Sequence, residues 1–200
     1  MAKAPAKPAT RKRDATATRA AILSSARRAF ADHGYDGAGV RDIAAGAGVT
    51  AMMVNRYFGS KEGLFAAVVA DSMAEPVILS GDNIGAPDMA VRFAKALVGI
   101  TGEGKSPLDG FLILFRSSSS EMAAQIAREQ IAEIHLRAAT DAIAAPDAKI
   151  RAALLLSLVA GFQMMRQMIA LDTLTDADDT DLERWLTPVL AAILGTAAKA

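Results

Sequence analysis

Hydrophobic residues recur every three or four positions along most of this 200-residue chain, which is the spacing of amphipathic helices. Ile22, Ala26 and Phe30 stand at fourfold spacing, so they predict a first helix over residues 19–34. Apolar residues make up 52% of the chain and aromatic residues 5%, so the core consists mainly of Ala, Leu, Ile, Val and Met. Such a mixture favours helix, and the sequence therefore predicts an all-α protein.

Residues 39–64 predict two short helices joined by a tight turn. The first helix has its apolar residues on one face at positions i, i+3, i+4 and i+7, namely Val40, Ile43, Ala44 and Ala47. Gly48 suits a turn that requires a positive φ angle. The Thr50 hydroxyl can cap the second helix by accepting a hydrogen bond from a backbone N–H group.

The second helix of this pair has an inward face and an outward face. Val54 and Phe58 point inward at i and i+4, so Met52 and Arg56 lie on the opposite face. Two short helices with a tight turn and an outward second helix form a helix-turn-helix, which fits the DNA major groove. The spacing alone is also consistent with an ordinary helical hairpin whose outer face is solvated.

The residues in this stretch resemble the DNA-binding motif of TetR-family transcriptional regulators. The resemblance rests on a helix VRDIA at residues 40–44, a turn GVT at residues 48–50 and an ending YFGSKEGL at residues 57–64. A match of this length favours the helix-turn-helix over the plain hairpin. The similarity extends over the N-terminal third of the chain.

The resemblance implies a domain organisation. It implies an N-terminal three-helix helix-turn-helix domain at residues 18–64, with the motif at residues 39–58, and a C-terminal helical domain for effector binding and dimerisation at residues 65–200. Residues 1–17 contain Lys, Arg and Pro but little to bury, so we expect a disordered basic arm there. Such an arm either lies along DNA or has no contact with it.

The resemblance also implies which side chains face DNA. They are Arg41, Thr50, Ala51, Met52, Met53, Asn55, Arg56 and Tyr57, with Lys61 placed for a phosphate. Among them, Arg56 can pair with guanine and Asn55 with adenine. Asn55 stands where the family usually has an aromatic residue, and Met52 and Met53 stand where it has small or branched residues. The operator sequence therefore cannot be transferred from a relative.

The distribution of charge agrees with a nucleic-acid partner, although the formal net charge is zero. Through Lys61 the chain has eleven Lys and Arg residues and four Asp residues, so this part carries +7 and the remainder −7. A basic front and an acidic remainder are typical of a DNA-binding domain joined to a domain with another role. A basic tail that only aids solubility would not explain Arg41 and Lys61.

The last part of the chain is unusually apolar. Residues 150–171 predict a long helix that is hydrophobic nearly all round. Residues 182–194 predict a last helix with an apolar stripe and a kink at Pro188. Such helices lie either in a deep core or at a two-fold dimer interface. Because TetR-family dimers pair their last two helices, the resemblance favours a homodimer.

Several side chains of the C-terminal part are candidates for contact with an effector: Phe111, Phe115, Arg116, His135, Phe162, Met165 and Arg166. Methionine and aromatic side chains suit a permissive apolar cavity, and the polar members could orient a ligand. Residue by residue, an ordinary place in the helical core or on its surface is the stronger explanation.

The sequence has no constellation of residues for catalysis or metal binding. Cysteine is absent, two histidines are present, and no glycine-rich phosphate loop or nucleophile motif occurs. We therefore expect no enzyme, no cofactor and no metal site. The sequence has no uninterrupted apolar run of about 18 residues and no secretory signal, so we expect a cytoplasmic protein.

These features together predict a DNA-binding transcriptional regulator. By resemblance to the family, it binds a palindromic DNA operator as a homodimer through its last two helices, and an unknown small-molecule effector releases it. Repression is the commoner mode of action in the family. The alternative is a helical ligand-binding or protein-interaction module whose helix-turn-helix no longer binds DNA.

Overall fold

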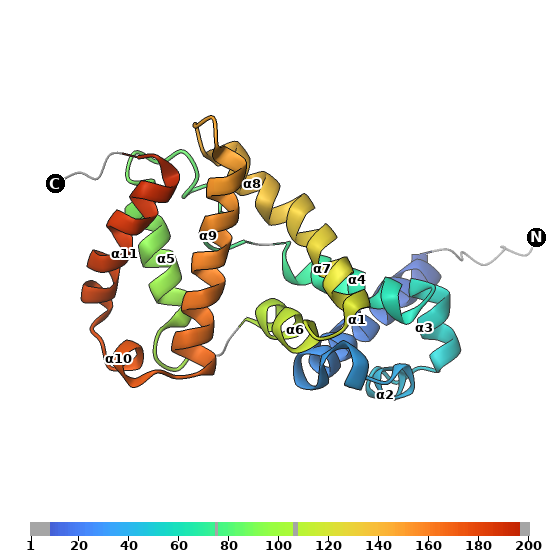
Figure 1. Ribbon diagram of the computed structural model, residues 1–200. Helices are drawn as coiled ribbons and strands as arrows, with labels where there is room; N and C mark the ends of the chain where they lie inside the picture. Colours follow the sequence, from blue (N-terminus) through green and yellow to red (C-terminus); the bar gives the residue numbers. More distant parts are fainter. Residues whose placement is uncertain (1–8, 75, 106–107, 197–200) are drawn as a thin grey trace, which may run out of the picture. The chain divides into compact units, whose positions relative to one another are not determined.

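The computed structural model describes residues 9–74, 76–105 and 108–196, and these residues form helices joined by turns and loops, with no β-strand among them (Figure 1). The α-helices are α1 (Ala9–Gly37), α2 (Val40–Gly46), α3 (Ala51–Phe58), α4 (Lys61–Ser72), α5 (Met89–Thr101), α6 (Asp109–Ser117), α7 (Glu121–Ile131), α8 (Arg137–Ala142), α9 (Ala148–Gln163), α10 (Asp172–Thr175) and α11 (Asp179–Leu194). Two π-helical segments are η1 (Ala132–Leu136) and η2 (Met164–Met168). The predicted all-α fold is confirmed.

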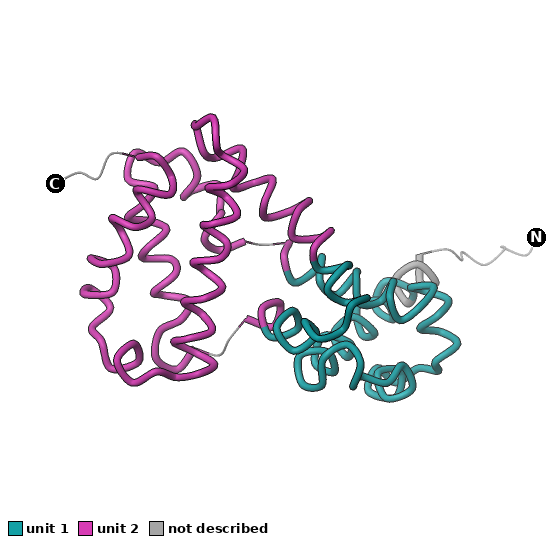
Figure 2. Tube along the Cα trace, viewed as in Figure 1, with its two compact units in different colours: residues 1–72, 112–127 teal, residues 73–111, 128–200 magenta. Residues whose placement is uncertain are grey.

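The chain folds as two compact units, each built from two stretches of sequence (Figure 2). Unit 1 consists of residues 1–72 and 112–127, and unit 2 consists of residues 73–111 and 128–200. Unit 1 therefore joins α1–α4 to most of α6 and the first part of α7. The C-terminal domain expected at residues 65–200 includes α6 and α7, because hydrophobic periodicity does not reveal which helices pack together.

Helix α1 begins earlier than the sequence predicted. Residues 9–17 are helical rather than disordered, while residues 1–8 of the predicted arm lie outside the described residues. Alanine, arginine and lysine have high helix propensity. Once the buried part of α1 has formed, the helix can therefore continue toward the N-terminus through residues 9–17. At the other end, Gly34 adopts φ 67° and ψ −177° and interrupts α1 at the residue where the sequence predicted its end.

The core of unit 1 forms where α1 packs against α2 and α4. The predicted inward residues Ile22, Ala26 and Phe30 are fully buried. Phe65 of α4 meets Phe30 edge-on with 5.0 Å between ring centroids, and Tyr35 meets Phe65 in the same way at 5.1 Å. Edge-to-face pairs contribute about 0.5–1.5 kcal/mol each beyond the burial of their area. These three rings therefore hold α4 against α1.

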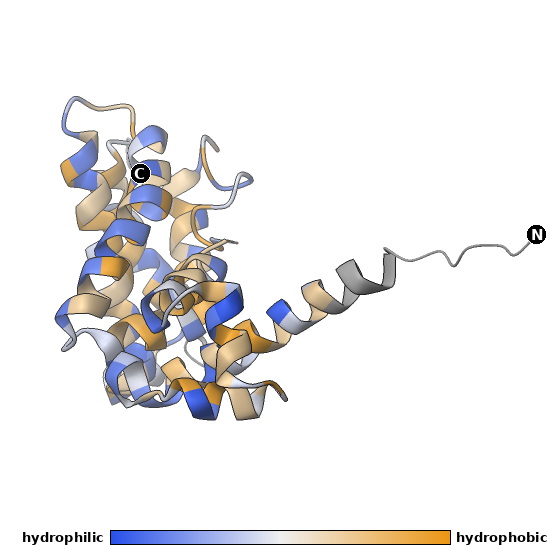
Figure 3. Ribbon diagram, turned by 90° about the vertical axis from the view of Figure 1, so that its right-hand side faces the viewer, coloured by the Kyte–Doolittle hydropathy of each residue, from blue (hydrophilic) through white to orange (hydrophobic). Residues whose placement is uncertain are grey.

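Helix α5 packs against α11 in unit 2, and α11 also packs against α9. The core takes one face from each of these helices, with Phe93 and Leu97 from α5, Leu155 from α9, and Leu186 and Leu190 from α11. Full burial of such a side chain contributes about 1.5–3 kcal/mol. Figure 3 shows hydrophobic and hydrophilic residues interspersed along the helices.

Two π-helical segments interrupt the helices that follow α6 in the described part of the chain. The helix predicted for residues 150–171 is α9 followed by η2, and it ends at Met168. Between α7 and α8, η1 interrupts the regular helix in the same way. A π-helical turn inserts an extra residue into an α-helix and is often found at functional sites. Pro188 lies inside α11, and its kink stays a prediction.

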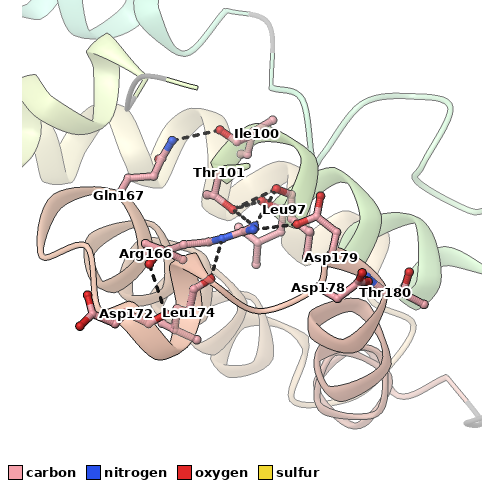
Figure 4. Close-up of polar contacts among 12 residues, drawn as sticks. Leu97, Ile100, Thr101, Arg166, Gln167, Asp172, Leu174, Asp178, Asp179 and Thr180 are labelled. Carbon is pink, nitrogen blue, oxygen red and sulfur yellow. Dashed lines mark hydrogen bonds and ion pairs between the residues drawn. The ribbon is translucent and has the colours of Figure 1, made fainter. Parts of the chain in front are cut away.

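A buried arginine joins several helix ends in unit 2 (Figure 4). Arg166 of η2 is 5% exposed. Its guanidinium donates hydrogen bonds to the carbonyl oxygens of Val98 and Leu174, each at 3.1 Å, and to the hydroxyl of Thr101 at 3.2 Å. It also pairs with the carboxylate of Asp179 at 2.7 Å. A buried guanidinium requires such partners, so this network ties η2 to the end of α5, to α10 and to the start of α11.

Helix α9 continues into η2 as a long apolar segment. Residues Ala148–Met168 could cross a membrane by length and composition alone, and 17% of the most apolar window of this segment is buried within the chain. Ile150 and Leu154 are 67% and 54% exposed. The segment therefore has an apolar face that the described part of the chain does not cover.

Candidate nucleic-acid interface

Helices α2 and α3 form a helix-turn-helix. Gly48 in the turn has a φ of 68°, which glycine adopts without the strain that a Cβ would cause. Thr50 is the N-cap residue of α3, and its hydroxyl accepts a hydrogen bond from the Met53 N–H at 3.4 Å. The predicted cap is confirmed, and it fixes the start of α3 relative to the turn.

Close packing seats α2 on α1. The buried hydroxyl of Ser25 donates a hydrogen bond to the carbonyl oxygen of Ile43 at 2.8 Å. A Cβ on Gly46 would stand 2.5 Å from the same hydroxyl oxygen. Glycine at this position therefore lets α2 lie directly against α1, and α2 cannot shift along α1 without breaking the contact.

Helix α3 has one buried face and one exposed face. Val54 is fully buried, whereas Met52 is 78% exposed and Asn55 and Arg56 are exposed as well. Phe58, which the sequence predicted to point inward, is half-buried because it lies in the last turn of the helix. Four further residues of this helix and its cap are predicted to contact DNA. Thr50 is exposed, and the half-buried ones are Ala51, Met53 and Tyr57. Whether these side chains contact DNA stays a prediction.

Two cations of the helix-turn-helix have no partner in the described part of the chain. Arg41 of α2 and Arg56 of α3 are exposed, and neither has an ion pair or a hydrogen bond to another described residue. By contrast, Arg27 of α1 pairs with Asp71 of α4. The guanidinium groups of Arg41 and Arg56 are therefore available to an external acceptor, either an anionic DNA phosphate or the hydrogen-bonding edge of a base.

Lys61 lies at the start of α4, directly after α3. Helix α3 ends at Phe58, and Gly59, with a φ of 79°, follows as its C-cap residue. The Ser60 hydroxyl accepts the Gly63 N–H at 3.1 Å, so Ser60 caps α4. The Lys61 ammonium lies 4.6 Å from the centroid of the Tyr35 ring, within the range of a cation–π contact. The charge is therefore held at the N-terminal end of a helix, where anions are favoured.

We expect Gly63→Ala to destabilise unit 1, because a Cβ at this position would stand 2.2 Å from the carbonyl oxygen of Phe58. Relief of that overlap requires α4 to move off the end of α3, and overpacking of this kind costs about 1–3 kcal/mol. Urea unfolding measures the change. Gly99→Ala is the control, because a Cβ there meets nothing within 4 Å. Equal stability of the two variants would contradict the expectation.

The predicted effector residues are divided between the two units. Phe115 and Arg116 belong to unit 1, and the members that belong to unit 2 are Phe111, His135, Phe162, Met165 and Arg166. Arg116 donates to the carbonyl oxygen of Ala31 in unit 1, and Arg166 uses its donors in the network of Figure 4. Both arginines therefore have structural partners, which favours a packing role over the orientation of a ligand.

The next candidates are His135, Phe162 and Met165, which lie on or beside the two π-helical segments. His135 of η1 is half-buried, and burial lowers the pKa of its imidazole, so the ring is neutral at pH 7. A neutral imidazole can donate one hydrogen bond and accept another. Met165 of η2 is 37% exposed, and Phe162 packs against the core of unit 2. Contact of these residues with an effector stays a prediction.

Sequence reasoning missed Tyr35 as a residue of this region. Its ring lies beneath the Lys61 ammonium, and its hydroxyl donates to Glu62 at 3.0 Å. Its backbone N–H donates to the hydroxyl of Ser117, 82 positions later in the chain. No periodicity or spacing connects residues so far apart, and only the packing of α6 against α1 brings them together.

Comparison with known proteins gives two family matches. Residues 22–68 match the family described as "Bacterial regulatory proteins, tetR family". Residues 87–194 match the family described as "Tetracyclin repressor-like, C-terminal domain". Together the two matches include the helix-turn-helix and most of unit 2.

The chain is similar to one curated repressor over its N-terminal part and to solved structures over most of its length. It is 38% identical over 68 residues to the transcriptional repressor AcnR of Corynebacterium glutamicum, which is 34% of this chain and 36% of that protein. The chain thus spans about a third of that curated relative. A TetR-family regulator from Streptomyces coelicolor A3 has a TM-score of 0.60 and 26% identity, over 96% of this chain and 99% of that one. FadR from Bacillus subtilis in complex with stearoyl-CoA has a TM-score of 0.63 and 17% identity, over 86% and 96%.

Proposed function

Because the chain belongs to the TetR family of bacterial regulatory proteins, we propose that it is a DNA-binding regulator of transcription. It acts in the cytoplasm as a homodimer on a palindromic operator, and it represses transcription until a small-molecule effector releases it. The observation that carries this proposal is the exposed surface of the helix-turn-helix, on which Arg41 of α2 and Arg56 of α3 have no partner among the described residues.

Each side chain of this face has a role in the proposed complex. Helix α3 lies in the major groove, where Arg56 pairs with a guanine and Asn55 with an adenine. Met52, which is 78% exposed, rests on a thymine methyl group. Arg41 reaches a base from the adjoining α2, and Lys61 binds a phosphate that positions the helix-turn-helix.

The exposed face of α9 and α11 supports the homodimer. On α9, Ile150 and Leu154 are exposed, and on α11, Trp185 and Val189 are 70% and 47% exposed. Each pair follows helical spacing, and α9 packs against α11 within unit 2. Exposed apolar residues of this kind mark an interaction surface, and two copies that meet through the same surface are related by a two-fold axis, the usual symmetry of soluble dimers.

The exposed apolar residues of α9 also belong to the segment Ala148–Met168, which is long and apolar enough to cross a membrane. Helix α9 of this segment packs against α11, and α11 exposes Arg184 and Asp181 as an ion pair at 2.9 Å next to Trp185. A lipid-facing surface avoids such charges, whereas an interface between soluble subunits tolerates them at its rim. A second copy of the chain is therefore the proposed partner of this face.

The effector is proposed to bind in unit 2 among apolar side chains. FadR, which shares the fold, was solved with stearoyl-CoA. Phe162 and Met165 offer apolar and deformable surfaces, and the neutral imidazole of His135 offers a hydrogen bond. We therefore propose an effector that is largely apolar and carries a polar group.

We expect Lys61→Ala and Arg41→Ala to weaken DNA binding in different ways. Loss of the phosphate contact at Lys61 weakens binding to all sequences alike and reduces the salt slope by about 0.9 per protomer. Loss of Arg41 weakens the operator selectively, by about tenfold or more. Selection from genomic fragments supplies the operator, and fluorescence anisotropy at several salt concentrations measures both constants.

Arg92→Ala is the control, because Arg92 is an exposed arginine of α5 that already pairs with Asp88. It leaves both affinities unchanged. Equal losses on operator and random DNA for Arg41→Ala would exclude its role in reading a base. A folded dimer that shows no salt-dependent DNA binding would favour the alternative function, a helical ligand-binding or protein-interaction module.

A further inference from the structure

Tyr35 lies where α1, α4 and α6 meet in unit 1. It is 6% exposed and follows Gly34, whose φ of 67° and ψ of −177° interrupt α1. Because the helix is interrupted there, the Tyr35 N–H points to another helix and donates to the Ser117 hydroxyl of α6 at 2.9 Å. The backbone of Tyr35 is thereby fastened to α6.

Two further contacts hold α6 against the end of α1. The Arg116 guanidinium donates to the carbonyl oxygen of Ala31. A Cβ on Gly34 would stand 2.5 Å from the carbonyl oxygen of Arg116, so the two backbones approach as closely as glycine allows. A displacement of this part of α6 must therefore carry Tyr35 with it or leave a buried N–H unsatisfied, which is unfavourable.

The side chain of Tyr35 faces α4 instead. Its hydroxyl donates to Glu62 at 3.0 Å, and its ring lies 4.6 Å from the Lys61 ammonium. Burial and the hydrogen bond to Glu62 raise the pKa of Tyr35 to about 12, so the hydroxyl remains a donor at physiological pH. The Ser60 hydrogen bond, with help from Tyr35, lowers the pKa of the Glu62 carboxyl, which therefore remains an acceptor.

We propose that Tyr35 is a positioning residue for the phosphate contact of Lys61, and that it connects α6 to this contact. The inference rests on the proposed DNA-binding function, because Lys61 needs a phosphate to bind. Tyr35 touches no DNA in this arrangement. Its ring fixes the ammonium group, its hydroxyl fixes the first turn of α4, and its backbone follows α6. A change in the position of α6 thus alters the affinity of unit 1 for DNA.

A double-mutant cycle tests the positioning role. Tyr35→Leu removes the ring and Tyr35→Phe removes only the hydroxyl, and each is made with Lys61 and with Lys61→Ala. The dissociation constant for a random-sequence DNA duplex is measured for the full chain. We expect Tyr35→Leu to weaken binding by roughly three- to fivefold per protomer when Lys61 is present. In the Lys61→Ala background we expect almost no further loss. Tyr35→Phe keeps the ring under Lys61 and loses only the hydrogen bond to Glu62, so it should weaken binding less than Tyr35→Leu does.

Equal losses from Tyr35→Leu with and without Lys61 would overturn the proposal, because Tyr35 would then act on the fold as a whole. A failure of the proposed DNA-binding function would give a different result in the same experiment. In that case the wild type itself shows no salt-dependent binding to the duplex, and Lys61→Ala changes nothing.

Hydrogen exchange tests the connection to α6 without a change at Tyr35. We expect DNA at saturation to slow the exchange of residues 112–117 in the wild type, because coupling between two sites is reciprocal. In Lys61→Ala, whose substituted side chain is only half-buried, the same DNA at saturation should leave the exchange of residues 112–117 unchanged. Equal protection of residues 112–117 in both proteins would exclude Tyr35 as the link, whatever the outcome for Tyr35→Leu.

Discussion

Replacing Arg166 with alanine is expected to lower the free energy of unfolding by about 3–5 kcal/mol, a loss that few single substitutions reach. Arg166 is 5% exposed and bonds acceptors on α5, α10 and α11. Its removal takes one donor from the carbonyl oxygen of Val98 and one from the hydroxyl of Thr101, breaks the ion pair with Asp179 and opens a cavity. Urea unfolding at one fixed protein concentration measures the loss, since the stability of a dimer depends on concentration.

Asp179 and Arg184 provide graded controls for this prediction. The Asp179 side chain is 57% exposed, so Asp179→Ala removes a partner that solvent largely screens, and we expect a loss of about 1 kcal/mol. Arg184 forms an exposed ion pair with Asp181, and Arg184→Ala should change stability by less than about 0.5 kcal/mol. If Arg166→Ala were no more destabilising than Arg184→Ala, the network would contribute nothing to stability.

Leu154→Asp is expected to raise the dissociation constant of the dimer by about a hundredfold or more. Leu154 is 54% exposed within the chain and lies on the proposed interface. A two-fold axis places the new carboxylate at the interface twice, and each unpaired charge that is buried costs several kcal/mol. Every 1.4 kcal/mol is a tenfold change in the constant, so the effect is large even after solvent relaxes around the charges. Sedimentation equilibrium measures it.

Val77→Asp is the matched control, because Val77 is 47% exposed on unit 2 but lies outside α9 and α11. It should leave the dimer intact. The monomeric Leu154→Asp protein should remain helical but lose affinity for the operator, because one half-site then binds alone. A dimer that tolerates Leu154→Asp would place the two-fold interface elsewhere.

The helix-turn-helix could be predicted from sequence because the information that specifies it is local. A cap such as Thr50 acts on a residue three positions away, and a turn glycine such as Gly48 acts on its own φ angle. Helical periodicity likewise separates the buried Val54 from the exposed Met52. The resemblance of residues 40–64 predicted the family correctly, because a contiguous stretch of sequence is enough to identify both the motif and the family.

The parts that escaped prediction depend on contacts distant in sequence. Arg166 stood out as a polar residue in an apolar stretch, but its partner Val98 lies 68 positions earlier and has no sequence signal. The same holds for Tyr35 and Ser117. A π-helical segment such as η2 shifts the apolar pattern by only one residue. Over so short a stretch the sequence pattern is the same as that of a continuous α-helix. Helix α1 begins earlier than predicted, because the charge and proline content of residues 1–17 indicate disorder whereas the Ala, Arg and Lys residues among them have high helix propensity.

The division of unit 1 between residues 1–72 and 112–127 has a consequence for synthesis on the ribosome. Domains generally fold as units during translation, from the N-terminal end. The N-terminal stretch that carries the helix-turn-helix emerges first, but the acceptor for the Tyr35 N–H arrives only with Ser117. The nascent DNA-binding unit therefore stays incomplete until α6 has been made, and a shortened chain that ends at residue 72 would lack part of its own core.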